Sequence, residues 1–504
     1  MFKKKKLALG IAAGFIGAVG IMTSAQAVHV NSDGTGQVLL FPYYNAHSGY
    51  VTNINLINST DETKAVKIRF REGDKSNDVL DFNIYMSPQD VWTGSIRGIE
   101  DKDKNLIGSI STRDRTCTLP QLASCKDDKC EVTIPFTGHQ VYKDVDAADT
   151  REGYVEVIEM GVVTDKTVQA GVLHKDGTPA NCTAVETAWS KGSFQQGAGA
   201  AATGMSAPTG GLFGSSAVLN VAEGTAFAVD PVAVDNYSTV AQHYLSDDPN
   251  NFLLPSLASG DVTTSSVLAK DAAGNAELVE TQWKTVPDTC LNDKDSLTPQ
   301  CGINPYPMAH VLLASHVMNE YFLDPTDGYD GHTDWVLTFP MKKHGIHNVD
   351  TDVALTVDGV YDREEGMPDM VYDKDFGFSP VLPGKAKEES VLKREVNVVT
   401  FLTSDPSYDD SRTVLSSHSG QSLSVGSFVH GWARMSFPGY DLSAGWSAAS
   451  TYGKTATKHD ATSYLYQGVA VTGFAALEGN VSANAHARFG DALPHKTNRS
   501  GTAK

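Results

Sequence analysis

The chain has 504 residues, of which 41% are hydrophobic, 20% charged and 9% aromatic, with 45 Gly and 21 Pro. This composition excludes a coiled coil, a collagen and a largely disordered chain, and leaves a globular protein. Asp and Glu number 60 against 40 Lys and Arg, so the formal net charge is −20. Because binding to phosphates needs clustered cations, this balance argues against a nucleic-acid partner.

The first 27 residues have the pattern of a secretory signal peptide. Four consecutive lysines at 3–6 precede an apolar run over 7–22, and Ala25-Gln26-Ala27 supplies the small residues of a cleavage site. We expect cleavage between Ala27 and Val28, and export to the periplasm, the cell surface or the medium. Loss of the four lysines takes the net charge from −20 to −24. No later stretch reaches the roughly 18 apolar residues of a membrane-spanning helix, so none is expected in the mature chain.

Cysteines in the exported part predict disulfides. Their number is even, and an oxidising compartment favours three bridges. The spacings match no paired C-x-x-C zinc knuckle. Two of them, 290 and 301, are expected to bridge to each other and close a polar loop, whereas the pairing of the other four stays open. The six are Cys117, Cys125, Cys130, Cys182, Cys290 and Cys301.

Strand patterns dominate residues 28–112. Segments 66–71 and 80–87 alternate apolar and polar side chains, which is the period of half-buried strands. Further strand-like runs and turn residues follow at short intervals. This spacing predicts an N-terminal antiparallel β-sandwich, immunoglobulin-like or related. The further runs cover 37–44, 51–57 and 91–96.

The remaining chain is divided into two predicted parts. Residues 113–216 carry four cysteines and a Gly- and Ala-rich stretch over 192–216, and are predicted to form an insertion. Residues 217–504 are predicted to be a C-terminal, mainly β region. Helical patterns are few: 309–322 fits a short helix or a strand pair, and 238–245 is a weaker candidate. The predicted fold class is therefore mainly β, an antiparallel sandwich with disulfide-stapled insertions and few short helices.

An acidic segment over 324–334 is the best candidate for a metal site. It contains Asp324, Asp327, Asp330 and Asp334, with glycines between them that permit a tight loop. Calcium binds several hard oxygen ligands on a flexible loop, so calcium is the candidate cofactor. The alternative is a solvated turn that leads into a strand beginning at Trp335.

Catalytic motifs are incomplete. The nearest approaches to the serine-hydrolase pattern G-x-S-x-G, at 204–207 and 445–448, lack the closing glycine. His344-Gly345-Ile346-His347 lacks the glutamate of a zinc-protease motif. An enzyme is therefore an alternative without a supporting motif.

Aromatic residues and the N-terminal strand suggest binding surfaces. Exposed aromatic rings can stack on sugars, although a Trp in an alternating strand is more often part of the core. Pro42 removes a hydrogen-bond donor and predicts an edge strand or a bulge, and an N-terminal edge strand can pair with another copy. The aromatic candidates are Tyr43, Tyr44, Trp92, Trp335, Trp432 and Trp446.

These observations indicate a class of function without a resemblance to a family. We expect an exported cell-surface or extracellular-matrix β-protein that acts through protein–protein or ligand interfaces, with a structural or adhesive role. Its partners would be proteins or glycans at the cell surface, with self-association as one route. The alternatives are a secreted hydrolase of polysaccharides or esters, and a periplasmic carbohydrate- or lipid-binding protein.

Overall fold

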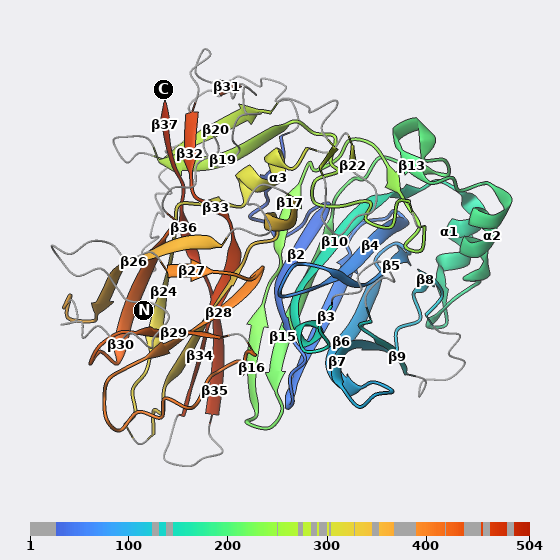
Figure 1. The fold of residues 1–504 in the computed structure, drawn as a ribbon. Helices are drawn as coiled ribbons and strands as arrows, with labels where there is room; N and C mark the ends of the chain where they lie inside the picture. Colours follow the sequence, from blue (N-terminus) through green and yellow to red (C-terminus); the bar gives the residue numbers. More distant parts are fainter. Residues whose placement is uncertain are drawn as a thin grey trace, which may run out of the picture.

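A computed structural model shows a mainly β protein with several antiparallel sheets and few short helices, which confirms the predicted class at that level. The N-terminal strands, blue to green in Figure 1, lie beside the orange and red C-terminal strands. We call residues 27–262 the N-terminal lobe and residues 304–498 the C-terminal lobe. The described residues are 27–122, 131–137, 145–248, 250–270, 276–283, 290–291, 300–301, 304–326, 328–344, 352–366, 390–418, 420–437, 455–456, 464–480 and 488–503.

Two sheets form the N-terminal lobe and enclose a core between them. Their apolar side chains alternate along each strand, so that Ile68, Phe82 and Trp92 meet in this core. The first sheet has the order β1 (His29–Val30), β17 (Val232–Asp235), β2 (Val38–Asn45), β10 (Glu152–Val163), β4 (Lys64–Glu72), β5 (Asp78–Met86), β8 (Cys117–Leu119), with β14 (Met205–Ser206) beside β10. The second has the order β16 (Thr225–Val229), β15 (Leu212–Asn220), β3 (Tyr50–Asn58), β6 (Val91–Glu100), β7 (Leu106–Thr112), β9 (Val132–Pro135).

The C-terminal lobe repeats this layout with two five-stranded sheets. Trp335, Phe401 and Met435 belong to the core between them. One sheet has the order β27 (Ser390–Leu392), β26 (Val353–Asp362), β30 (His430–Ser436), β24 (His316–Phe322), β36 (Lys496–Asn498). The other has the order β29 (Gln421–Ser424), β28 (Val396–Leu402), β25 (His332–Thr338), β34 (Thr472–Asn480), β35 (Arg488–Pro494).

A smaller sheet and short elements complete the fold. The small sheet has the order β31 (Thr455–Ala456), β20 (Ala276–Gln282), β19 (Thr264–Lys270), β37 (Ser500–Ala503), β32 (Tyr464–Gln467). Two-stranded pairs are β11 (His174–Lys175) with β12 (Thr178–Pro179), β13 (Gly197–Ala198) with β18 (Gln242–His243), β21 (Cys290–Leu291) with β22 (Gln300–Cys301), and β23 (Leu313–Ala314) with β33 (Val469–Ala470). The helices are α1 (Lys166–Val172), α2 (Thr183–Lys191), α3 (Tyr306–Val311) and the 3-10 turns η1 (Asp149–Arg151), η2 (Gly199–Ala201) and η3 (Lys342–His344). Among the described residues, none of these helices could cross a membrane.

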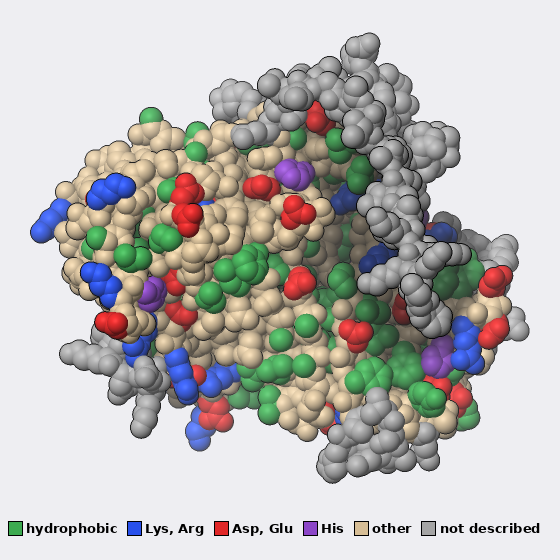
Figure 2. Space-filling view, turned by 180° about the vertical axis from the view of Figure 1, so that it is seen from behind, with side chains coloured by type: hydrophobic (Ala, Val, Ile, Leu, Met, Phe, Trp, Pro, Cys, Tyr) green, Lys and Arg blue, Asp and Glu red, His purple; other side chains and the backbone are tan. Residues whose placement is uncertain are grey.

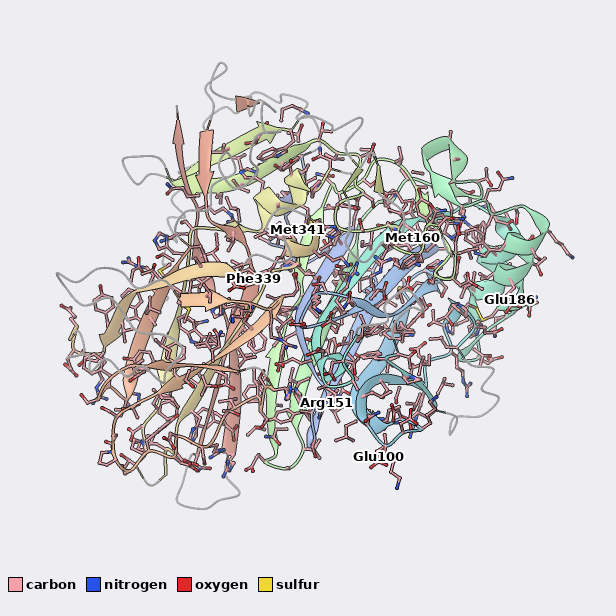
Figure 3. All side chains as sticks on the ribbon, viewed as in Figure 1. Glu100, Arg151, Met160, Glu186, Phe339 and Met341 are labelled. Atoms are coloured by element: carbon pink, nitrogen blue, oxygen red, sulfur yellow. A yellow bond between two sulfur atoms is a disulfide. The ribbon has the colours of Figure 1, made fainter. Side chains whose placement is uncertain are left out.

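A third core, which we call the seam, joins the two lobes. Leu40 and Tyr43 of β2 pack there with Val336 of β25, and Met341 belongs to the same core. Phe339, two residues earlier, lies in the C-terminal core, and both side chains sit where the lobes meet in Figure 3. Because β2 sends alternate side chains into the seam and into the N-terminal core, all eight of its residues are buried.

The strand that contains Pro42 is an interior strand by its place in the sheet order, because β17 and β1 extend the sheet beyond β2. The β17 pairing covers Val38 to Leu40 and ends before Pro42. The pairing of β2 with β10 changes register between Gly153 and Val155. One residue of β10 faces Pro42 and Tyr43 of β2 there, so β2 bulges at Pro42. The bulge predicted at Pro42 is therefore confirmed, and the edge strand is wrong. The Pro42 carbonyl instead accepts a hydrogen bond from Thr338 Oγ1 of the other lobe at 2.7 Å.

Polar side chains of β4 correct a second expectation. Lys67, Arg69 and Arg71 are at most 1% exposed, although their alternation predicted a half-buried strand. Ion pairs compensate their burial: Lys67 Nζ lies 2.9 Å from Asp81, and Arg69 Nε lies 2.6 Å from Asp78. The loop after β18 covers this face, because Arg69 also donates to the carbonyls of residues 252 and 255.

The helical candidates have mixed outcomes. Segment 309–322 holds the end of α3 and then β23 and β24, so both alternatives occur in it. Segment 238–245 contains β18 and no helix. Within residues 113–216, β10 lies between β2 and β4 at the centre of the first sheet.

Candidate functional site

A groove lies where the two lobes and the small sheet meet. It consists of two cavities, of about 520 and 330 Å³, that share Val30, Val311 and Arg499 in their walls. β1, β19 and β20 line the first cavity; β16, β17, β24 and β34 contribute to the second. We call the two cavities together the seam groove.

The first cavity has an apolar, solvent-exposed rim. Leu268 and Leu278 are directly paired across β19 and β20, and they are 63% and 44% exposed. Their neighbours Val267 and Val279 point to the opposite face of the sheet and are buried in the core. Val30 on β1 is 38% exposed. Three large apolar side chains therefore face water around this cavity. Hydrophobic side chains also form patches among acidic ones on the face shown in Figure 2.

Both lobes contribute walls to the second cavity. Val229 and Val232 come from the N-terminal lobe, and Val317 and Phe474 come from the C-terminal lobe. Leu312, directly after α3, also lines this cavity. This wall is largely apolar because strands of both lobes turn valines toward the same space.

Arg499 is the one Lys or Arg among the described residues that line the groove. It connects β36 and β37, and its Nη2 donates to the carbonyl of Val311 at 2.8 Å. Its Nε is buried and has no hydrogen-bond partner among the described residues, and no described carboxylate forms an ion pair with it. Burial lowers the pKa of the Arg499 guanidinium from its ordinary value. A positive charge is thus held in the wall common to both cavities.

His495, which lines the second cavity, is satisfied by the protein itself. Its Nε2 donates to the Val336 carbonyl at 2.9 Å, and its Nδ1 accepts from Asn319 Nδ2 at 3.0 Å. Desolvation lowers the pKa of His495 to about 4. The imidazole is therefore neutral near pH 7 with both nitrogens engaged, which makes it a poor general base.

A serine, a histidine and a carboxylate meet elsewhere in the seam. Glu152 accepts from Tyr43 Oη at 2.7 Å and from Ser417 Oγ at 2.8 Å, and His47 Nε2 lies 3.7 Å from its carboxylate. Burial raises the pKa of Glu152, but the nearby His47 imidazole and the hydrogen bonds from Tyr43 and Ser417 outweigh it and lower the pKa. A catalytic triad needs the serine bonded to the histidine, whereas here both contact the carboxylate. The cluster holds the lobes together and does not support a hydrolase.

The acidic segment predicted to bind calcium directs its carboxylates to different partners. Asp324 lies 3.0 Å from His430 Nε2, Asp330 lies 2.6 Å from Arg412, and Asp334 accepts from the Leu415 amide at 2.8 Å. Asp327 lies outside the described residues. In the described part of the chain, no group of three or more His, Cys, Asp or Glu is arranged to hold a metal. Calcium binding here stays a prediction.

The cysteines and the cleavage site have these positions. Cys117 of β8 and Cys182, next to α2, form a disulfide with Cα atoms 5.2 Å apart. Cys290 and Cys301 are backbone partners across β21 and β22, as their expected bridge requires, but their side chains lie outside the description. Cys125 and Cys130 also lie outside the described residues. Ala27 lines the first cavity, and the Val28 amide donates to the Thr264 carbonyl at 2.8 Å. Cleavage after Ala27 stays a prediction.

Of the five aromatic candidates that the structure describes, one reaches the surface. Trp432 is 37% exposed and stacks on Tyr361, its cross-strand partner, with ring centroids 4.7 Å apart. Trp446 lies outside the described residues. The other four are buried in the cores: Tyr43, Tyr44, Trp92 and Trp335.

Sequence patterns did not find the seam groove. Its one signal is that Leu268 and Leu278 each stand directly beside a valine, so that both faces of a short strand carry an apolar residue. The sequence around Arg499 does not mark it as a site residue, because the residues that form the groove around it lie far away in the sequence.

Comparisons with known proteins give no match: no family model, no curated protein and no solved structure matches the chain. The fold and the groove define the class, a mainly β protein of two lobes with cavities between them. The function must be argued from this groove.

Proposed function

We propose that this is an exported binding protein that captures a ligand with an apolar body in the seam groove. Pockets of this size with mostly apolar walls, formed where parts of a chain meet, are the usual form of a small-molecule site. The proposal keeps the expected export, to the periplasm, the cell surface or the medium. A disulfide between Cys117 and Cys182 supports an oxidising compartment.

The exposed apolar rim of the first cavity carries the proposal. Apolar surface left in water costs about 25 cal/mol per Å² relative to burial, and clustered exposure of this kind marks binding sites in soluble proteins. Leu268, Leu278 and Val30 cluster beside an open cavity. A ligand that covers them recovers this free energy.

An immunoglobulin-like form of residues 28–112 stays part of the proposal. Its support is that β2, β4 and β5 lie in one sheet and β3, β6 and β7 in the sheet that packs against it.

The test is binding of a neutral fluorescent probe, N-phenyl-1-naphthylamine, to residues 28–504 stripped of bound lipid. Saturable binding near one probe per chain is expected. Val30→Trp should abolish it, because Val30 lines both cavities. Val221→Trp is the matched control, since Val221 is 66% exposed and lines neither cavity. Absence of saturable binding, or equal binding by both variants, would refute the proposal.

A second candidate is glycan binding at the Tyr361–Trp432 pair. The observation that favours it is an exposed aromatic stack with charged neighbours, because Arg434 Nε lies 2.9 Å from Asp358 on the same two strands. Sugar rings pack on such faces while flanking polar groups bind their hydroxyls. Trp432→Ala should abolish retention on a glycan array while V30W leaves it unchanged; equal retention by wild type and Trp432→Ala would exclude this site.

A further inference from the structure

We propose that the ligand of the seam groove is an anionic amphiphile, a long-chain carboxylate, whose head group pairs with Arg499 and whose chain lies on the apolar walls. This inference rests on the proposed function, since it names the chemical class that the same groove would take.

The first argument is the unsatisfied hydrogen-bonding capacity of Arg499. A guanidinium has five N–H donors arranged in a planar fork. One nitrogen, Nη2, donates to the Val311 carbonyl, and Nε is buried without an acceptor among the described residues. A buried donor without an acceptor is unfavourable, and a carboxylate supplies two acceptor oxygens in a geometry that matches the fork. Because Nε is closed to solvent, a carboxylate in the groove would meet the outer N–H groups of Nη1 and Nη2, and no described carboxylate forms an ion pair with them.

The second argument is charge. Arg499 is the only Lys or Arg among the described residues that line the two cavities. One carboxylate lines each cavity, Glu280 in the first and Asp230 in the second. An anionic head is thus favoured at Arg499 and disfavoured near either carboxylate, which fixes the position of the head group in the groove.

The third argument is position. Because Arg499 lies in the wall common to both cavities, a head group bound there leaves apolar surface on two sides. Leu268 and Leu278 lie on one side, and Val317 and Phe474 lie on the other. A flexible chain can follow either wall. A short anion such as acetate would meet the guanidinium and leave the apolar rim exposed, so the chain is part of what is recognised.

The experiment is calorimetric titration of residues 28–504, stripped of bound lipid, with four twelve-carbon probes below their micelle concentrations. The probes are dodecanoate, dodecanol, dodecyl phosphate and dodecyltrimethylammonium, with acetate as the chain-free control. Dodecanoate should bind one per chain, at least about tenfold more tightly than dodecanol, because a hydrogen bond to a charged group adds at least that factor. Acetate should not bind detectably.

Variants separate the head group from the chain. Arg499→Met should reduce dodecanoate to the affinity of dodecanol and leave dodecanol unchanged, whereas Arg499→Lys should keep part of the preference. Thermal melts report whether these variants fold. Leu268→Gln, at an exposed position on the rim, should weaken dodecanoate and dodecanol alike, because it removes apolar wall. Leu268→Glu should weaken dodecanoate further than Leu268→Gln does and dodecanol to the same extent, because only the anionic head group responds to the added negative charge. This pair keeps the test informative even if Arg499→Met unfolds.

The outcomes distinguish this inference from the proposed function. Equal binding of dodecanoate and dodecanol, unaffected by Arg499→Met, would overturn the anionic head group and leave the groove as an apolar binding site. Tighter binding of the phosphate would overturn the carboxylate assignment, and tighter binding of the ammonium would place the head group at a carboxylate. Failure of every twelve-carbon probe to bind would overturn the proposed function itself.

Discussion

We expect Glu395 to make the stability of the protein depend on pH. It precedes β28, is fully buried, and neither of its carboxylate oxygens has a hydrogen-bond partner among the described residues. Two lysines of η3 lie nearby, but Lys342 Nζ donates to the Lys393 carbonyl at 2.7 Å and Lys343 Nζ to the Ser76 carbonyl at 3.0 Å. Burial raises the pKa of Glu395 from 4.5 to about 8, against the opposing field of the two lysines. The folded protein therefore holds Glu395 protonated at pH 7.

The sign follows from proton linkage. Between pH 4.5 and about 8 the folded chain binds a proton at Glu395 that the unfolded chain releases, so the free energy of unfolding falls as pH rises through this window. A tenfold difference in proton affinity corresponds to about 1.4 kcal/mol, which sets the full cost above the window at about 5 kcal/mol. Relaxation of the buried site would reduce this cost to about 2 to 5 kcal/mol.

Glu395→Gln removes the titration and keeps the shape of the side chain. We expect no change in the free energy of unfolding near pH 4.5, and a gain by the variant of about 2 to 5 kcal/mol at pH 8. Urea unfolding followed by tryptophan fluorescence at pH 5, 6, 7 and 8 measures this difference, with Glu320→Gln on the exposed side of β24 as the control. An equal loss of stability at every pH would refute the reasoning, since it would show that Glu395 is ionised and paired with the lysines.

Four other perturbations follow from buried groups and from the disulfide. Burial raises the pKa of Asp334 from 3.8 to about 6, so the free energy of unfolding falls as pH rises through this window. Asp334→Asn should therefore raise the free energy of unfolding by about 3 kcal/mol above pH 7, measured by the same urea unfolding. Arg69→Met leaves Asp78 buried without its 2.6 Å partner and should cost about 3 to 5 kcal/mol in urea unfolding, whereas Arg69→Met with Asp78→Leu should recover most of it. Replacing Cys117 and Cys182 by serine frees a loop of 65 residues and should cost about 2 to 5 kcal/mol. Reductant should lower the melting temperature of the wild type by more than that of the variant, because the variant has already lost this bridge and keeps only the other expected ones. If the acidic segment that ends at Asp334 binds calcium, a saturating amount should raise the melting temperature and a chelator should reverse it; an unchanged transition excludes that site.

Local patterns predicted the strands well. Alternation over 66–71 and 80–87 predicted strands that the structure has as β4 and β5, and the run over 37–44 predicted β2 to within a residue at each end. A strand of this kind is recognised from the alternation of side chains one and two positions apart, so a short stretch of sequence is enough to predict it. The expected partners Cys290 and Cys301, eleven positions apart, also face each other across a hairpin.

Sequence patterns did not predict which distant segments pair with each other. Alternation in β4 shows that Lys67, Arg69 and Arg71 share one face, but whether that face meets water depends on a loop from beyond position 240 and on the other lobe. Pro42 shows that a hydrogen bond is missing, but only the addition of β17 and β1 makes its strand an interior one.

The sequence by itself determined the class of fold, the positions of many strands and the expectation of export, because each depends on composition or on a short pattern. Tertiary structure alone decided the candidate site. Arg499 reaches the groove because the end of the chain returns beside Val311 and Val30, residues that lie far earlier and belong to other elements. Whether a guanidinium can bind a ligand depends on its surroundings. Its burial, its unpaired N–H groups and the apolar walls beside it exist only in the folded protein.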